Sequence, residues 1–150
     1  MEKIVLAGGC FWCTEAVFTG VRGVISIVSG FSGGAIKNPA YREVCQGRTG
    51  HAECIELTYD PKELSLEVIL DLFFKTHDPT TLNRQGHDVG THYRSAIFYT
   101  TEDQKSTVGA YILALEQNSV YPSPIVTEVA PFDAFYPAEV EHQEYYKNNP

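Results

Sequence analysis

Hydrophobic and polar positions follow strand or helix spacing over most of the chain, and these patterns predict its elements. The apolar run Lys3–Ala7 predicts a buried strand, and Cys10–Thr19, which follows the glycine pair Gly8-Gly9, has helical composition. The β-branched run Val24–Phe31 predicts a second strand. Alternation over Cys54–Tyr59 predicts a third strand. The first third of the chain is therefore expected to form a strand, a tight turn, a helix and two further strands.

Helical periodicity returns in the second half of the chain. Apolar residues at i, i+3, i+4, i+7 and i+8 between Leu66 and Phe74 predict an amphipathic helix with Ser65 as its N-cap. Thr101–Gln104 has the spacing of a capping box, which predicts that another amphipathic helix begins there. The other expected segments are strands at Ser95–Tyr99 and Ile125–Ala130, a short helix at Pro137–Tyr146, and mainly loop at Ser32–Gly50 and Leu82–Tyr93.

The order of the first six elements, β-α-β-β-α-β, matches the ferredoxin-like split βαβ pattern. We therefore predict an α+β fold, a two-layer α/β sandwich with a central mixed sheet and an added C-terminal helix, strand and coil. A length of 150 residues suits one domain with a full core, so residues 1–150 are expected to form a single catalytic domain.

Composition narrows the class of protein. Hydrophobic residues make up 43% of the chain and charged residues 20%, which is typical of a globular protein. The formal net charge of −8, without any basic run, argues against nucleic-acid binding. We find neither a secretory signal nor an apolar stretch long enough for a membrane, so we expect a cytoplasmic protein without membrane contact. In that compartment the four cysteines favour catalytic or metal roles over structural disulfides.

The stretch Gly8–Cys13, GGCFWC, is the first candidate for chemistry. Zinc usually requires two closely spaced ligand pairs, which Cys45 and Cys54 do not supply, so no metal site is expected. Phe11 and Trp12 would obstruct the surface of a thioredoxin-like dithiol. A buried core thiol stays plausible for Cys13. For Cys10, a helix start with free N–H groups is expected to lower the thiol pKa, which predicts a nucleophile beside an apolar recess.

Four motifs in order resemble those of one enzyme family. They are Gly8-Gly9-Cys10-Phe11-Trp12, Asn38-Pro39-Ala40-Tyr41, Gly50-His51-Ala52-Glu53 and Gly90-Thr91-His92-Tyr93-Arg94-Ser95. Together they strongly resemble the A-type peptide methionine sulfoxide reductases, and the likeness covers nearly the whole chain. Taken singly, each residue has an ordinary structural explanation, so the inference depends on the four spacings together. A thiol peroxidase and a binding module with an aromatic cage remain the alternative functions.

The resemblance implies a role for each motif residue. Cys10 resembles the cysteine that attacks the sulfoxide sulfur, and Phe11 and Trp12 resemble the walls of the pocket for the substrate's S-methyl group. Glu53 resembles the acid that meets the sulfoxide oxygen, and burial would keep its carboxyl protonated at neutral pH. Tyr41 and Tyr93 resemble phenols that donate to the same oxygen. Asp88 resembles a residue that orients the substrate.

The implied activity is thiol-dependent reduction of methionine S-sulfoxide, free and in proteins, through a Cys10 sulfenic acid, which repairs oxidative damage. No bound cofactor is implied, and the expected partners are the sulfoxide substrate and an external reductant, thioredoxin or glutathione with glutaredoxin. We expect a monomer.

Because no cysteine follows Cys54, recycling by a C-terminal tail is not expected. Cys13, one helical turn from Cys10, is the candidate resolving cysteine, and direct attack by an external thiol is the rival. Cys45 resembles a family position without a recycling role, and strand alternation turns Cys54 away from the pocket.

Overall fold

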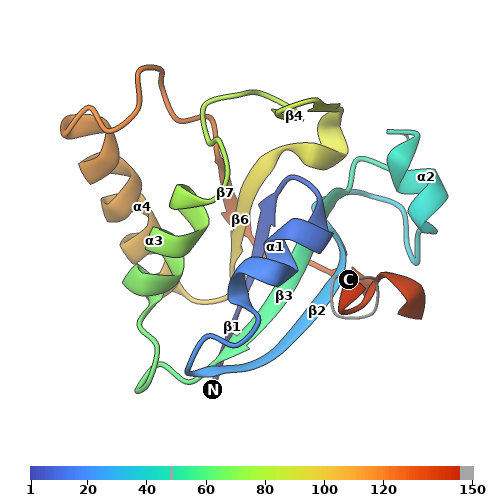
Figure 1. Cartoon of the computed structure of the whole chain (residues 1–150), viewed down its shortest axis with the longest axis horizontal. Helices are drawn as coiled ribbons and strands as arrows, with labels where there is room; N and C mark the ends of the chain where they lie inside the picture. The colour runs from blue at the N-terminus through green and yellow to red at the C-terminus, as the bar shows by residue number, and fades with distance from the viewer. Residues whose placement is uncertain (48, 146–150) are drawn as a thin grey trace.

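A six-stranded mixed sheet forms the centre of the molecule (Figure 1). The structure is a computed structural model and describes residues 1–47 and 49–145. The sheet has the order β7-β6-β1-β3-β2-β8, and only the β6–β7 pair is parallel. Its strands are β1 (Glu2–Gly8), β2 (Val24–Ser32), β3 (Ala52–Tyr59), β6 (Ser95–Tyr99), β7 (Glu128–Pro131) and β8 (Phe135–Pro137). The α+β class and the mixed sheet are therefore confirmed.

The remaining elements are helices and one small hairpin. The helices are α1 (Phe11–Phe18), α2 (Tyr41–Cys45), α3 (Leu66–Lys75) and α4 (Glu102–Gln117), with short 3₁₀ helices η1 (Thr91–Tyr93) and η2 (Val140–His142). Strands β4 (Arg84–Gln85) and β5 (Asp88–Val89) pair as the hairpin. In the part of the chain that the structure describes, no helix is both long and apolar enough to cross a membrane.

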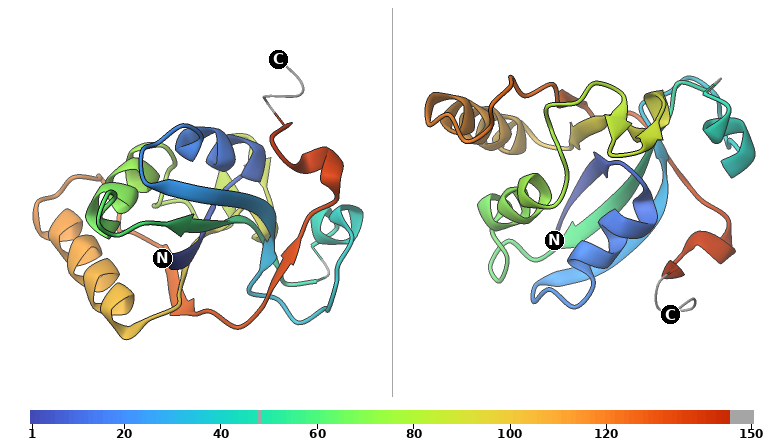
Figure 2. Two further views of the ribbon diagram at one scale, coloured as in Figure 1. Left: turned by 90° about the horizontal axis from the view of Figure 1, so that it is seen from below. Right: turned by 45° about the horizontal axis from the view of Figure 1, so that its top comes forward.

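Strand alternation divides the core between the two faces of the sheet. In β1, Ile4 and Leu6 belong to the larger core under the helices, whereas Val5 and Ala7 belong to a smaller cluster on the other face. Helices α1 and α3 cover the first face, and the segment from β7 to β8 crosses the second (Figure 2). Helix α4 lies against α3, where the rings of Phe74 and Tyr111 stack at 5.6 Å.

Both predicted helix caps are present. The Ser65 hydroxyl accepts a hydrogen bond from the Val68 N–H at 3.3 Å, and the Thr101 hydroxyl accepts one from the Gln104 N–H at 3.1 Å. In the predicted capping box Thr101–Gln104, the Gln104 side chain should accept a hydrogen bond from the Thr101 N–H, and the structure differs on this point. The Gln104 side chain accepts from the Thr100 N–H at 2.7 Å, one residue before the cap.

Several boundaries were predicted wrongly. The expected loop Ser32–Gly50 contains α2, and Leu82–Tyr93 contains the β4–β5 hairpin and η1. The late strand begins at Glu128 rather than Ile125, because its bounds follow its pairing with β6. The expected helix at Pro137–Tyr146 is instead the end of β8 followed by η2, and Tyr146 lies outside the described residues. Strand β8 pairs with the edge of β2, a tertiary contact that local spacing cannot indicate.

Candidate active site

Cys10 lies where β1 turns into α1, as the sequence predicted. Gly9 has a φ of +95°, and a Cβ there would come within 2.8 Å of the Gln85 side chain, so the turn requires glycine. Cys10 is the N-cap residue of α1. Its carbonyl accepts hydrogen bonds from the N–H groups of Cys13 at 3.1 Å and Thr14 at 3.2 Å. The thiol therefore stands at the first turn of the helix.

The expected low pKa of Cys10 is wrong. Burial raises the pKa of this thiol to about 12, although backbone hydrogen bonds from Trp12 and Cys13 act in the opposite direction. The nearby Glu53 carboxylate raises it further. The cost of taking a thiolate out of water thus exceeds the stabilisation that the helix N-terminus provides. In the resting structure Cys10 is a neutral thiol.

Glu53 is a buried acid beside the same turn. It lies on β3 opposite Phe31 and is 1% exposed. Its Oε1 accepts a hydrogen bond from the Phe11 N–H at 3.3 Å, while its buried Oε2 has no hydrogen-bond partner among the described residues. Burial raises the pKa of Glu53 to about 7, and the charge of Asp88 contributes in the same direction. The direction of this shift favours the protonated carboxyl that the resemblance implied.

Two tyrosines approach this acid from different elements. Tyr41 is the first residue of α2, and Tyr93 is the last residue of η1. Burial raises the pKa of both phenols above the usual range, and the Glu53 charge raises both further. Tyr41 also forms a side-chain hydrogen bond with Cys45. Asp88, exposed on β5, is close enough to raise the pKa of both Glu53 and Tyr93. Both phenols are therefore neutral donors.

Phe11 and Trp12 begin α1 but have different surroundings. Phe11 is fully buried, and its ring lies 5.7 Å from Phe31 and 5.9 Å from Tyr41. Trp12 is half-buried, and its indole N–H donates to Nδ1 of His142 at 3.2 Å. The ring of Tyr145 stacks on the indole at 3.8 Å.

Sequence reasoning missed His142 and Tyr145 entirely. His142 also lies against Tyr41, with ring centroids 4.2 Å apart. The Trp12–His142 contact joins positions 130 residues apart, and no local pattern indicates such a pair.

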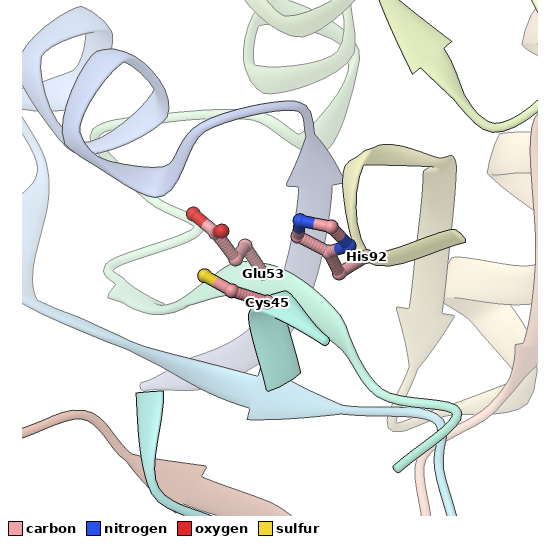
Figure 3. A group of neighbouring side chains, drawn as sticks. All are labelled: Cys45, Glu53 and His92. Carbon is pink, nitrogen blue, oxygen red and sulfur yellow. The ribbon is translucent and has the colours of Figure 1, made fainter. Parts of the chain in front are cut away.

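A second omission concerns Cys45 and His92. Cys45, the last residue of α2, was given no role in recycling, and His92 in η1 was given no chemistry. One potential ligand atom from each of Cys45, Glu53 and His92 lies within 4.8 Å of the other two (Figure 3). His92 is 6% exposed, and its buried Nδ1 has no hydrogen-bond partner among the described residues. The signal for this group in the sequence was weak, because Cys45 and Glu53 are 8 positions apart and Glu53 and His92 are 39 apart, which matches no metal-binding motif.

Neither Cys13 nor Cys54 belongs to this cluster. Cys13 is exposed and stands one turn after Cys10 on α1. Cys54 is buried in the small cluster on the opposite face of the sheet, and its thiol donates to the Gly30 carbonyl at 3.6 Å. The predicted orientation of Cys54, away from the pocket, is confirmed.

Known proteins resemble this chain over almost its full length. The sequence profile described as peptide methionine sulfoxide reductase matches residues 2–150. The peptide methionine sulfoxide reductase MsrA of Deinococcus radiodurans is 54% identical over 149 residues, which cover 99% of this chain and 72% of that protein. The MsrA of Chromobacterium violaceum is 50% identical, covering 99% of this chain and 85% of that protein.

Solved structures agree with the sequence matches. Methionine sulfoxide reductase A of Corynebacterium diphtheriae superposes with a TM-score of 0.87 at 37% identity, over 99% of this chain and 75% of that one. Reduced Mxr1 of Saccharomyces cerevisiae superposes with a TM-score of 0.93 at 33% identity, over 99% of this chain and 86% of that one. Mxr1 has also been solved in complex with Trx2. The profile and the identities show that the chain belongs to the peptide methionine sulfoxide reductase family.

Proposed function

We propose that this oxidoreductase reduces methionine S-sulfoxide, free and in proteins, with Cys10 as the nucleophile and Glu53 as the proton donor. The family membership supports reduction of methionine sulfoxide. The observation that carries the residue roles is Glu53, a buried carboxyl near Cys10 with an unpartnered oxygen. A sulfoxide is a poor electrophile until its oxygen is protonated or strongly hydrogen-bonded, and Glu53 supplies that proton.

The first step follows from these two groups. The Cys10 thiolate attacks the sulfoxide sulfur while Glu53 protonates the oxygen. The attack forms a bond between the Cys10 sulfur and the substrate sulfur. The hydroxyl oxygen then moves to the Cys10 sulfur as this S–S bond and the substrate S–O bond break, so that methionine leaves and Cys10 becomes a sulfenic acid. Cysteine sulfur is oxidised by two electrons and the substrate sulfur is reduced by two. The proton that Glu53 donates ends on the oxygen of the sulfenic acid, and Glu53 is left as a carboxylate.

Tyr41, Tyr93 and the aromatic residues orient the substrate in this proposal. The two phenols donate to the developing hydroxyl, which is electrostatic stabilisation of the transition state. For Tyr41 this means exchanging its hydrogen bond with Cys45 for one to the sulfoxide oxygen. Phe11 and Trp12 bound the recess for the S-methyl group, which selects the S epimer, and Asp88 orients the rest of the substrate.

Cys13 closes the cycle in this proposal. It stands at the third helical position after an N-cap Cys10, so the first turn of α1 keeps the two residues close. Its thiol displaces water from the Cys10 sulfenic acid to form a Cys10–Cys13 disulfide, which an external dithiol then reduces. The Mxr1–Trx2 complex supports thioredoxin as that reductant. Direct attack by glutathione with glutaredoxin is the competing route.

The fold, domain organisation, oligomeric state and location of the chain are also part of the proposal. The strand order β6-β1-β3-β2, with antiparallel pairs and helices after the first and third strands, supports the ferredoxin-like arrangement. We propose further that residues 1–150 act as one catalytic domain, as a monomer and in the cytoplasm.

Reduction of separated epimers tests the function. With dithiothreitol as reductant, the chain should convert the S epimer of a methionine sulfoxide substrate and leave the R epimer unchanged. Cys10→Ser should abolish conversion, and Cys54→Ser, on the other face of the sheet, should retain it. Equal rates on the two epimers, or none on either, would overturn the proposal. Rapid reduction of hydrogen peroxide would instead favour a thiol peroxidase.

Disulfide mapping tests the role of Cys13. Reduced protein is mixed with one equivalent of the S-sulfoxide, without added thiol, and digested for mass spectrometry. We expect one methionine per chain and a Cys10–Cys13 disulfide, and Cys13→Ser should accumulate the sulfenic acid. A persistent sulfenic acid in the parent protein would assign recycling to an external thiol.

A further inference from the structure

Three side chains at the site come from separate elements and converge. Cys45 ends α2, Glu53 lies on β3, and His92 belongs to η1 (Figure 3). A sulfur, a carboxylate oxygen and an imidazole nitrogen, one from each, lie within 4.8 Å of one another. In a tetrahedral zinc site, bonds of about 2.0 to 2.3 Å place ligand atoms roughly 3.3 to 3.8 Å apart. Side-chain movements of about an ångström therefore suffice to bring the three atoms into a coordination sphere.

Two of these side chains have buried atoms that lack hydrogen-bond partners. Glu53 is 1% exposed and His92 is 6% exposed. Neither Oε2 of Glu53 nor Nδ1 of His92 has a hydrogen-bond partner among the described residues. Buried polar atoms in folded proteins are nearly always paired, and each exception calls for an explanation such as an ion or a ligand. A cation bound by the Glu53 carboxyl would compensate a buried group that the protein leaves with an unpaired oxygen.

We propose that Cys45, Glu53 and His92 bind a thiophilic divalent cation, Zn²⁺ above all, and that the bound ion blocks sulfoxide reduction. Thiolate and imidazole ligands select Zn²⁺ over Mg²⁺ and Ca²⁺, which prefer oxygen. Three protein ligands leave a fourth position for water, as in zinc sites that are open to solvent. The binding releases the thiol proton of Cys45 and the carboxyl proton of Glu53, so the site fills less at low pH.

Inhibition follows from the groups that the ion engages, and this part depends on the proposed function. A coordinated Glu53 has no proton to give to the sulfoxide oxygen. A coordinated Cys45 sulfur changes its hydrogen bond with Tyr41, which we propose as a donor to the same oxygen. The ion also lies against the Glu53 carboxyl, which the sulfoxide oxygen must approach in the proposed reaction. Zn²⁺ is therefore expected to compete with the sulfoxide.

Cobalt absorption tests the site without any catalytic readout. Co²⁺ is titrated into reduced Cys10→Ser, Cys13→Ser protein, which removes the other thiol pair near the site. We expect one Co²⁺ per chain and a thiolate-to-cobalt charge-transfer band. The band should vanish when Cys45→Ser is added and should persist with Cys54→Ser. His92→Asn should weaken binding at least tenfold. Circular dichroism checks that each variant is folded. Absence of the band, or its survival in the Cys45→Ser protein, would overturn the proposal.

A single-turnover assay tests inhibition. Reduced protein receives one equivalent of S-sulfoxide without added thiol, so that no reductant binds the metal, and methionine is quantified with and without Zn²⁺. Each variant is compared with its own metal-free rate. We expect inhibition that more sulfoxide overcomes and a chelator reverses, with the half-inhibiting Zn²⁺ concentration at least tenfold higher in Cys45→Ser. Equal inhibition of that variant would contradict the proposal. An inactive metal-free protein would refute the proposed function alone, because the cobalt result stands separately.

Discussion

Cys10 and Glu53 have pKa values that are shifted in the same direction by the same cause. Burial raises the pKa of the thiol to about 12 and that of the carboxyl to about 7. The reactive state needs a thiolate and a protonated acid, so the pair must hold one proton between them. Such a pair titrates as a unit, and the pH profile of the enzyme reports on both groups.

Alkylation measures the thiol directly. With iodoacetamide, modification of the Cys10 peptide followed by mass spectrometry should accelerate about tenfold per pH unit through pH 9, because the thiolate fraction of such a thiol rises by that factor. In urea, the exposed thiol should level off near its ordinary pKa of about 8.5. A plateau below pH 9 in the folded protein would show that the helix N-terminus outweighs burial.

Glu53→Gln separates the acid from the thiol. In the parent, kcat/KM should rise with pH up to about 7, where Glu53 begins to lose its proton. Above that pH it should level off, because the gain in thiolate offsets the loss of acid. The variant should be slower at pH 7 by about 10²- to 10⁴-fold and should continue to rise beyond pH 7. Glu56→Gln on the same strand is the control, and a parent-like profile in Glu53→Gln would show that another group is the acid.

At the scale of elements, the segment after β8 returns to α1 and β2. The Gln143 side chain accepts from the Ser29 N–H at 2.9 Å and donates to the Ser29 carbonyl at 2.8 Å. The buried Glu15 carboxylate on α1 accepts from the N–H groups of Glu144 and Tyr145. These bonds place His142 and Tyr145 beside the indole of Trp12. The aromatic wall at the site therefore depends on two distant parts of the chain.

Gln143→Ala should loosen this attachment. Losing the side-chain bonds leaves the Ser29 N–H without its partner, while the Ser29 carbonyl keeps the hydrogen bond from the Ala138 N–H. We expect this to cost about 1 to 3 kcal/mol in the free energy of unfolding. Trp12 is the only tryptophan, so the intrinsic fluorescence reports on this contact, and we expect a red shift. Urea unfolding and emission spectra measure both effects, with Gln117→Ala at the exposed end of α4 as the control. Unchanged emission would mean that the stacking does not need Gln143.

At the scale of the whole molecule, two buried groups act oppositely on stability. Burial raises the pKa of Glu53 to about 7. The contribution of protonated Glu53 to the free energy of unfolding is therefore complete below about pH 4.5 and is lost as pH rises through 7. Burial lowers the pKa of His77 to about 4. As pH falls below 6.5, this histidine takes up a proton in the unfolded chain before it does so in the folded protein, so the free energy of unfolding decreases. Each shift corresponds to about 3 kcal/mol, and between pH 4.5 and 6.5 the two slopes nearly cancel.

Glu53→Gln should remove one of these slopes. The amide keeps an acceptor for the Phe11 N–H and carries no charge to bury. Relative to the parent, its free energy of unfolding should therefore increase by about 3 kcal/mol between pH 4.5 and pH 8. Urea denaturation at both pH values measures the difference. A pH-independent difference would show that Glu53 titrates normally in the folded state.

The sequence predicted most of the central fold because its signals are local. The glycine turn before Cys10, the caps at Ser65 and Thr101, and the alternation that sends Cys54 to the far face all arise from neighbouring residues. Strand β8 and helix α2 escaped prediction, since β8 is defined by pairing with β2 and α2 has a single turn. The motif residues were found through their collective spacing, which identifies a family without giving the environment of any side chain.

By itself, the sequence determined the family, the strand–turn–helix that presents Cys10, and the acid and phenols expected around it. Only the tertiary structure decided the state of those groups. Desolvation depends on every atom packed around a side chain, so the raised pKa of Cys10 could not be inferred from its position at a helix start. The roles of His142, Cys45 and His92 were also missed, because they too depend on the tertiary structure. Their places at the site result from folding that joins distant segments, and no local spacing records that proximity.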